Sequence, residues 1–261
     1  MSTPPKTPPK PKRKMPDEYD VLTIKLTQKL KAEVGKEIAA LLVVGSVAKG
    51  DYVKGDSDCD FYLVIKKDRD KQAEILQKIG KVKSEFENDP QYSSILDLMV
   101  FFEEDLTIEN INASSIVNWV HIWTGQQGVL KIGEENPFAA LKVSPKKLKQ
   151  GATQMCLDNV FLMRDGFLNA PPGSTDEIAF YGSDAAIACA QALMIFMGHG
   201  QINRYNVAEV FGEKVKLKLD PKVVIDARDY RLGAKIDNIT EFVEKCYDFG
   251  WAILEYMLKN G

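Results

Sequence analysis

One segment, residues 42–65, constrains the fold of this chain more than any other. In it an apolar run ends at Gly45-Ser46, and a second apolar run opens with two aspartates, Asp58 and Asp60. An apolar run that ends at a glycine is typical of a buried strand entering a tight turn. Side chains alternate along a strand, so the two carboxylates share one face and their apolar neighbours face the other way. The segment therefore predicts two strands, with a carboxylate pair at the start of the second.

A third carboxylate, Asp97, interrupts the run 95–102, which is otherwise apolar. A lone carboxylate in such a strand is energetically costly unless it is paired or bound to a metal. If this strand lies beside strand 59–65, Asp97 completes a triad with Asp58 and Asp60. Without a cation the three would repel one another, and oxygen ligands with no His or Cys favour Mg²⁺ or Mn²⁺. The simpler alternative, a Gly-Ser hairpin followed by an acidic strand start, does not explain Asp97.

The Gly45-Ser46 turn can supply an anion site beside these carboxylates. Gly45 allows the backbone to approach a ligand closely, and the N–H groups and hydroxyl at Ser46 can face an anion. Lys49 and Lys54 can reach a triphosphate, although a surface position is equally compatible with them. A phosphate cradle next to a carboxylate cluster predicts metal-assisted phosphoryl or nucleotidyl transfer, in which one metal ion orients the triphosphate and another activates the attacking hydroxyl.

These residues resemble the motif of the DNA polymerase β-type nucleotidyltransferase superfamily, and most closely that of its small prokaryotic and archaeal members. The shared features are the Gly-Ser turn, an eleven-residue gap, Asp58-x-Asp60 and a later apolar strand that carries Asp97. Ser57 also fits the family's common Ser-Asp-x-Asp form. Lys49 stands where many relatives carry Arg, which keeps the charge but loses the bidentate donor geometry.

The resemblance implies an α+β nucleotidyltransferase fold, with a mixed sheet of four to five strands and flanking helices. It also implies transfer of a nucleoside monophosphate from an NTP, by default ATP, to a hydroxyl acceptor that Asp97 helps to deprotonate. The implied catalytic residues and metal ligands are Asp58, Asp60 and Asp97. The implied nucleotide-binding residues are Gly45, Ser46, Lys49 and Ser57.

The order of the expected elements divides the chain into two parts. Before Gly133, strands are expected over 38–44, 59–65, 95–102 and 129–132, and helices over 21–34, 68–87 and 108–123. After Gly133 only helical patterns remain, over 145–168, 183–198, 203–212, 220–232 and 238–258. We therefore expect a catalytic domain over 17–142, followed by an all-helical bundle over 143–261.

The helical part, in particular residues 181–193, resembles the HEPN-type bundles that are often fused to such domains. The ribonucleases of that family use an Arg followed a few residues later by a His. Neither His121 nor His199 has an Arg four to six positions upstream. The resemblance therefore favours a substrate-binding or dimerising bundle over a ribonuclease.

The N-terminal segment, residues 1–16, holds six of the twelve prolines and five of the 34 basic residues, with no acidic residue. Such a segment buries almost no apolar surface, so we expect a disordered or polyproline II-like tail. The sharper alternative is a weak electrostatic tether to RNA or another acidic partner. The remaining 29 basic and 37 acidic residues give a net charge of −8. This charge disfavours a broad nucleic-acid-binding face.

Hydropathy and cysteine usage bear on the location of the protein. No stretch approaches 18 consecutive apolar residues, and the N-terminus lacks an apolar signal core, so we expect neither a membrane span nor a signal peptide. The four cysteines form no C-x-x-C pair and have no metal-ligand spacing. They are typical of reduced, mostly buried thiols in a cytoplasmic protein.

Two functions are compatible with these features. The preferred one is a metal-dependent nucleotidyltransferase whose acceptor lies between the two parts of the chain, since clefts between domains are favoured ligand sites. The alternative is a nucleotide-binding regulatory or antitoxin-like module with little turnover, which uses the bundle to hold a partner or to dimerise. The sequence leaves the acceptor, the nucleobase preference and the oligomeric state open.

Overall fold

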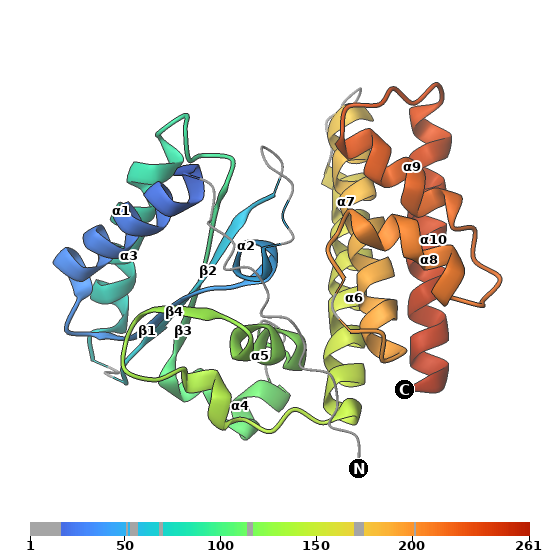
Figure 1. Cartoon of the computed structure of the whole chain (residues 1–261). Coiled ribbons are helices and arrows are strands. Elements are labelled where there is room, and N and C mark those ends of the chain that lie inside the picture. Colours follow the sequence, from blue (N-terminus) through green and yellow to red (C-terminus); the bar gives the residue numbers. More distant parts are fainter. Residues whose placement is uncertain are drawn as a thin grey trace, which may run out of the picture.

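The computed structural model describes residues 17–50, 52, 57–67, 70–113, 117–169, 175–200 and 202–261. They form two lobes, a sheet covered by helices and, beside it, a bundle of long helices (Figure 1). The α+β class with a following helical region, expected from the sequence, is confirmed. The expected tail, residues 1–16, lies outside the described residues.

Within the described residues the sheet has four strands: β1 (Ile38–Val43), β2 (Cys59–Ile65), β3 (Leu96–Phe102) and β4 (Val129–Ile132). Their order in the sheet is β3-β2-β1-β4. β1 runs antiparallel to β2 and β4, whereas β2 and β3 are parallel, in a register that pairs Asp60 with Asp97. The strand that carries the third carboxylate therefore lies directly beside the strand that carries the second.

Alternation along β2 separates two cores on the two faces of the sheet. On one face, the buried side chains of β2 pack beneath α1 (Asp17–Val34) and α3 (Gln72–Glu87), and they are Cys59, Phe61, Leu63 and Ile65. The other face is covered by two short α-helices and two 3₁₀ helices. These are η1 (Glu103–Leu106), α4 (Ile108–Ala113), α5 (Trp119–Gln126) and η2 (Pro137–Ala140). The sequence prediction that the apolar residues of this strand pack under helices is confirmed.

The sequence predicted one helix over 108–123, and the structure has two, α4 and α5. Asn118 is the N-cap of α5, because its Oδ1 accepts hydrogen bonds from the backbone N–H groups of Val120 (2.9 Å) and His121 (3.2 Å). Asn is among the most favourable N-cap residues, since its side chain satisfies donors that a helix start leaves open. The cap therefore begins a new helix where the apolar spacing alone suggested a helix interior.

The second lobe consists of helices α6 (Pro145–Asn169), α7 (Thr175–Phe196), α8 (Asn206–Lys214), α9 (Lys222–Arg231) and α10 (Ile239–Asn260). α7 lies at its centre and packs against α6, α9 and α10. By length and composition α7 is apolar enough to cross a membrane, but 67% of its most apolar window is buried in the bundle. A buried core helix meets the same criterion. All four cysteines are buried and unpaired, as expected.

α5 joins the two lobes. Its Trp119 and Ile122 pack in the core beneath the sheet, whereas Val120 packs in the core of the bundle. Gly151 of α6 makes the contact close, because a Cβ at this position would lie 2.8 Å from the backbone N of Val120. Helix packing therefore holds the two lobes against each other, and it fixes the walls of the cleft between them.

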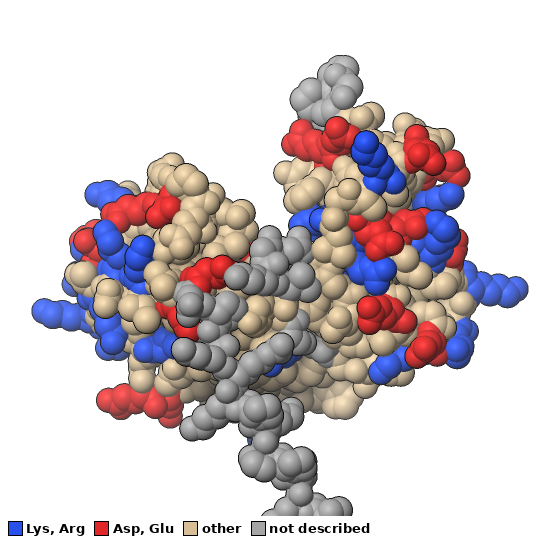
Figure 2. Space-filling model, turned by 45° about the horizontal axis from the view of Figure 1, so that its top comes forward, with Lys and Arg blue, Asp and Glu red and all other residues tan. Residues whose placement is uncertain are grey.

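The charge is mixed on one face of the molecule. On the face drawn in Figure 2, basic and acidic side chains are intermingled over both lobes. A face that coats nucleic acid would instead gather one sign of charge. The pattern on this side therefore agrees with the net negative charge of the chain.

Candidate active site

A cleft of about 240 Å³ lies between the two lobes. The wall from the sheet lobe is formed by Gly45, Ser46, Lys49, Ser57, Asp58 and Asp60. The wall from the bundle is formed by Asp184, Ala188, Gln191, Ile202, Asn203 and Arg204. Six of the seven site residues predicted from the sequence therefore meet at one cleft. The seventh, Asp97, stands opposite Asp60 on the neighbouring strand.

The turn at Gly45 is built around the carboxylate of Asp60. β1 ends just before this turn, and the short helix α2 (Gly45–Lys49) follows it. Gly45 has a φ of 66°, which favours glycine, and a Cβ at this position would collide with Oδ2 of Asp60. The backbone N–H of Val44 donates to the carbonyl oxygen of Asp60 at 2.9 Å. Gly45, which was expected to allow close approach of a ligand, thus allows close approach of the Asp60 carboxylate.

Asp58 and Asp60 lie on one face of β2, and Asp60 stands beside Asp97 in the register of β2 and β3. Adjacent strands are about 4.8 Å apart, so these two carboxylates are near neighbours. The sequence argument about Asp97 assumed that this carboxylate is buried at an energetic cost. The side chain of Asp97 is exposed, so that cost does not apply. Asp97 lies near the start of β3, where the strand borders a cavity. Proximity rather than burial links it to the site.

Asp60 is the electrostatic centre of this group. Burial and, after it, the charges of Asp97 and Asp58 raise the pKa of Asp60 to about 7, while the charge of Arg204 opposes this shift. Two effects that disfavour the ionised form, desolvation and like charge, therefore act on one carboxyl group. A bound cation would favour the ionised form instead.

The three carboxylates have the chemistry of a site for a hard divalent cation, because all the donors are oxygens. In the described part of the chain, no three His, Cys, Asp or Glu side chains already surround a common point. A cation would therefore have to draw the carboxylates of Asp58, Asp60 and Asp97 together. The repulsion at Asp60 favours binding there, because the ion removes it.

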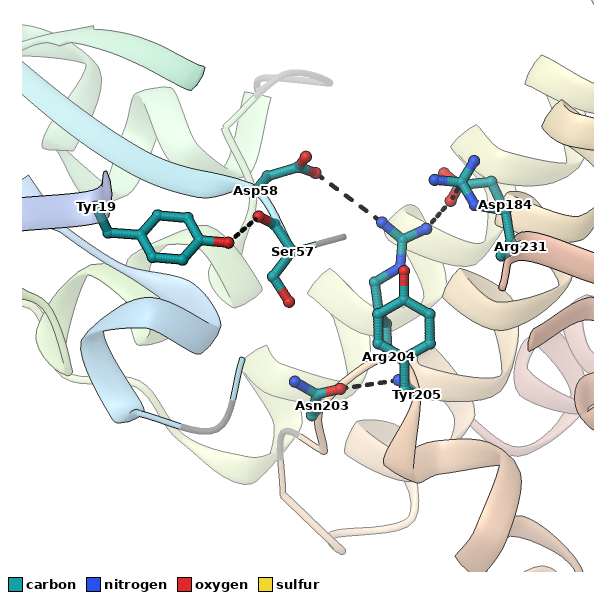
Figure 3. Close-up of polar contacts among 8 residues, drawn as sticks. All are labelled: Tyr19, Ser57, Asp58, Asp184, Asn203, Arg204, Tyr205 and Arg231. Atoms are coloured by element: carbon teal, nitrogen blue, oxygen red, sulfur yellow. Dashed lines mark hydrogen bonds and ion pairs between the residues drawn. The ribbon is translucent and has the colours of Figure 1, made fainter. Parts of the chain in front are cut away.

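Arg204 connects the two walls of the cleft (Figure 3). Its Nη1 lies 4.0 Å from Oδ2 of Asp58, and its Nη2 forms an ion pair with Oδ1 of Asp184 on α7. Arg231 of α9 approaches the same oxygen of Asp184 at 3.7 Å and lies over the ring of Phe180. The result is a row of alternating charges that runs from β2 into the bundle.

Backbone contacts place the residues at both ends of this row. The hydroxyl of Tyr19 donates to the carbonyl oxygen of Ser57 at 2.9 Å, and burial raises the pKa of Tyr19 to about 12. On the bundle side, Oδ1 of Asn203 accepts a hydrogen bond from the backbone N of Tyr205 at 2.8 Å (Figure 3). These contacts fix the backbone next to Asp58 and around Arg204.

The sequence analysis missed the bundle wall. Asp184 carries a usable signal, because it is the only charged residue between positions 178 and 196, much as Asp97 interrupts an apolar strand. Arg204 carries no such signal. It lies in the turn between α7 and α8, and only the fold brings it to Asp58.

A second cavity, of about 330 Å³, adjoins the first. The two share Gly45 and Asp60, and the second cavity alone is bordered by Asp97. Its other walls include Tyr62 of β2 and side chains from α5 and α6. Burial, together with the charges of Asp60 and Asp97, raises the pKa of Tyr62, so the phenol is neutral. Two compartments thus meet at the carboxylates.

Comparisons with known proteins agree with this geometry. Residues 24–90 match the family described as nucleotidyltransferase domain, and this range holds the Gly-Ser turn and both aspartates of β2. No curated protein sequence matches the chain significantly. A solved structure with a similar fold is the spectinomycin adenyltransferase AAD(9) from Enterococcus faecialis, with ATP and spectinomycin. It has 13% sequence identity and a TM-score of 0.62, and the match covers 88% of this chain and 99% of that chain. Residues 24–90 thus match a nucleotidyltransferase domain, and the fold of the chain is similar to that of an adenyltransferase.

Proposed function

We propose that this chain transfers a nucleoside monophosphate from an NTP, with ATP as the default, to a hydroxyl group of an acceptor bound beside Asp97. The observation that supports this most is the placement of Asp58 and Asp60 next to the turn at Gly45, with Asp97 opposite Asp60 on the neighbouring strand. The protein of similar fold was crystallised with ATP and spectinomycin. ATP and a small-molecule acceptor are therefore the first substrates to test.

The first cleft would hold the triphosphate. Ser46 and Lys49 approach it from α2, and Arg204 approaches it from the bundle. Lysine contributes a mobile point charge, whereas arginine presents several donors in one plane that match phosphate oxygens. Arg204 already faces a carboxylate of the opposite wall. Phosphate oxygens that take over this guanidinium would release Asp58 to bind a cation.

Asp58, Asp60 and Asp97 would hold the divalent cation, Mg²⁺ or Mn²⁺, in the two-metal arrangement that the sequence analysis expected. When bound, such ions neutralise the triphosphate and the departing pyrophosphate. The role of Gly45 is to leave room for the carboxylate of Asp60 at this point. The role of Ser57, which is buried, is to carry Asp58 on a backbone segment tied down by Tyr19.

The proposed reaction makes one bond and breaks one. The acceptor oxygen forms a bond to the α-phosphorus, and the bond from that phosphorus to the oxygen bridging to the β-phosphate breaks. Pyrophosphate leaves, and the carboxylate of Asp97 accepts the proton of the acceptor hydroxyl. Asp97 suits this task because its exposed side chain borders the second cavity, where it can later release the proton to water. A general base of this kind contributes about 10²–10⁴-fold to a rate.

The bundle has a substrate-binding role in this proposal, because it supplies Arg204 and the far wall of the cleft. The HEPN-like resemblance and a homodimer through the bundle remain further parts of the proposal, and light scattering of the full chain would test the dimer. A cytoplasmic location fits the four buried, unpaired thiols.

The test is transfer of label from [α-³²P]ATP with Mg²⁺ to a panel of hydroxyl acceptors, beginning with spectinomycin. We expect wild-type protein to release pyrophosphate and label an acceptor, and Asp60→Asn to lose about 10³-fold or more in rate. The matched control is Asp226→Asn, because Asp226 pairs with Lys222 on the exposed surface of α9, away from the cleft. Nucleotide binding without pyrophosphate release in any of these proteins would favour the regulatory, antitoxin-like module. Absence of nucleotide binding would refute both.

A further inference from the structure

The second cavity holds a polar group that the proposed transfer does not yet use, the hydroxyl of Tyr62. Tyr62 follows Asp60 on the same face of β2, and it lines the cavity together with Asp97. Only 7% of the surface of Tyr62 is exposed. Its ring is held in place by an edge contact with Phe101 and a tilted contact with Phe138, at centroid distances of 4.9 and 5.7 Å.

Within the described part of the chain, no protein group forms a hydrogen bond to the hydroxyl of Tyr62, and this oxygen is not among the fully buried atoms that lack a partner. The hydroxyl is therefore accessible from the cavity that Tyr62 lines. Natural proteins satisfy such groups with protein, water or ligand. The ring of Tyr62 is fixed, and its hydroxyl lies at the cavity beside two carboxylates. This hydroxyl is therefore placed to form a hydrogen bond to a ligand bound there.

The other residues that line the cavity restrict the chemistry of the ligand. Asn159 of α6 donates its Nδ2 to the carbonyl oxygen of Met155 at 2.8 Å, which leaves its Oδ1 as an acceptor at the cavity. Met99 and Met155 add apolar surface. No Lys or Arg among the described residues borders the cavity, whereas Asp60 and Asp97 do. His121 also borders the cavity. The charge of two divalent cations bound at the carboxylates would be offset by the three carboxylates and the triphosphate, so an anionic acceptor would still meet repulsion there.

We propose that Tyr62 is an acceptor-binding residue, whose phenol hydroxyl donates a hydrogen bond to the acceptor and holds its reacting hydroxyl beside Asp97. The acceptor is a small polyhydroxy compound without negative charge, bound in the 330 Å³ cavity. This inference rests on the proposed function, because it needs the nucleotide in the first cleft. It adds to that function a specificity residue and the exclusion of phosphorylated acceptors.

The variant that tests it is Tyr62→Phe, which keeps the ring contacts and removes only the hydroxyl. The matched control is Tyr92→Phe, because Tyr92 is equally buried, and its hydroxyl accepts a hydrogen bond from Lys25 at the distant contact of α1 with α3. Thermal unfolding of both variants checks the fold. We expect no loss of stability in Tyr62→Phe, because the hydroxyl forms no hydrogen bond to a described protein group.

Binding is measured by saturation-transfer NMR and calorimetry on the full chain with Mg²⁺ and a non-hydrolysable ATP analogue. The probes are myo-inositol, 2-deoxystreptamine and myo-inositol 1-phosphate, which are similar in size and differ in charge. We expect at least one of the first two to bind saturably, and the phosphate to bind at least tenfold more weakly. Tyr62→Phe should weaken that binding about 3- to 30-fold, as loss of one hydrogen bond does. Its affinity for the ATP analogue, and all affinities of Tyr92→Phe, should stay unchanged.

Three results would overturn the inference. In the first, the wild type binds neither myo-inositol nor 2-deoxystreptamine. In the second, it binds myo-inositol 1-phosphate as tightly as these probes or more tightly. In the third, Tyr62→Phe binds the probes with the same affinity as the wild type. The third would mean that water alone satisfies the hydroxyl. If the ATP analogue itself fails to bind, the proposed function is wrong, so the two failures are distinguishable.

Discussion

The charged side chains on the two walls of the cleft are held in position by different interactions. On the sheet wall, Asp58 directly precedes β2, Asp60 lies in it and Asp97 lies on its parallel neighbour, so backbone hydrogen bonds set their spacing. On the bundle wall, Arg204 is held by ion pairs with Asp184 and Asp58. The register between two buried strands is strongly specified, whereas an ion pair near the surface contributes only about 1 kcal/mol or less to stability. We therefore expect changes in the sheet wall to abolish chemistry, and changes in the bundle wall to weaken substrate binding.

The largest effect is expected from Gly45→Ala. The added Cβ would collide with Oδ2 of Asp60, and the positive φ of 66° is unfavourable for alanine. We expect a loss of about 2–3 kcal/mol in the free energy of unfolding, together with loss of transfer. The matched control is Gly80→Ala, because a Cβ at Gly80 of α3 meets nothing within 4 Å. It should gain up to about 1 kcal/mol. Equal urea midpoints for the two variants would contradict the close contact at the turn.

The second effect concerns pH and Asp60. Its pKa is about 7 in the folded chain against 3.8 for an ordinary aspartate. Between these values the folded state binds more protons than the unfolded state, so the free energy of unfolding of the metal-free protein falls as pH rises from about 4 to 7. The loss is on the order of 2–4 kcal/mol.

Urea unfolding in EDTA at pH 5 and pH 8 measures this loss, with Asp60→Asn as the comparison. The variant should lack the loss at pH 8 and be more stable there than the wild type, although it is inactive. Mg²⁺ at pH 8 should restore stability to the wild type but not to the variant. A wild type that is more stable at pH 8 than at pH 5 in EDTA, with the variant unchanged, would mean that the Asp60 site is not strained.

The third effect is expected at the bundle wall, in Arg204→Ala. Loss of charged hydrogen bonds to the triphosphate should raise the KM for ATP about 10- to 100-fold, since each contributes about 1.5–3 kcal/mol. The free energy of unfolding should change by less than about 1 kcal/mol. The control is Arg228→Ala, because Arg228 pairs with Asp229 at 2.8 Å and does not border the cleft. A fall in kcat with unchanged KM would place Arg204 in the chemistry instead.

The smallest effect is expected from Asp184→Asn. The variant keeps the shape of the side chain but removes the charge that holds Arg204 and Arg231. We expect about 1 kcal/mol or less of destabilisation and a few-fold rise in the KM for ATP, with kcat unchanged. Combined with Arg204→Ala, it should add almost nothing to the KM, because the two act through one contact. Fully additive effects would show that they act independently.

The sheet wall could be predicted from the sequence because its determinants are local. Gly45, Asp58 and Asp60 lie within one strand-turn-strand segment, and period-two alternation assigned each side chain to a face. The neighbouring position of Asp97 followed from a single assumption about strand pairing, which the register of β2 and β3 fulfils. The reason given for Asp97 was nevertheless wrong, because apolar neighbours in sequence did not make it buried.

The place of Arg204 on the bundle wall could not be predicted, because its determinants are distant in the sequence. Arg204 is 146 positions from Asp58, and its place depends on how α7, α5 and α6 pack. Local patterns also failed where a cap competes with apolar spacing, as at Asn118, where one expected helix became two. The role of Tyr62 is similar, since only the folded cavity distinguishes its hydroxyl from that of any other strand tyrosine.

The central claim is that Asp58, Asp60 and Asp97 bind a divalent cation that accompanies a nucleotide in the cleft. Its most direct test is a crystal of the full chain grown with a non-hydrolysable ATP analogue and Mn²⁺, examined by anomalous diffraction. The account predicts a manganese peak at the carboxylates of Asp58 and Asp60, with the triphosphate between the Gly45 turn and Arg204. A triphosphate bound in the cleft with no manganese at these carboxylates, or a nucleotide bound elsewhere on the chain, would contradict it.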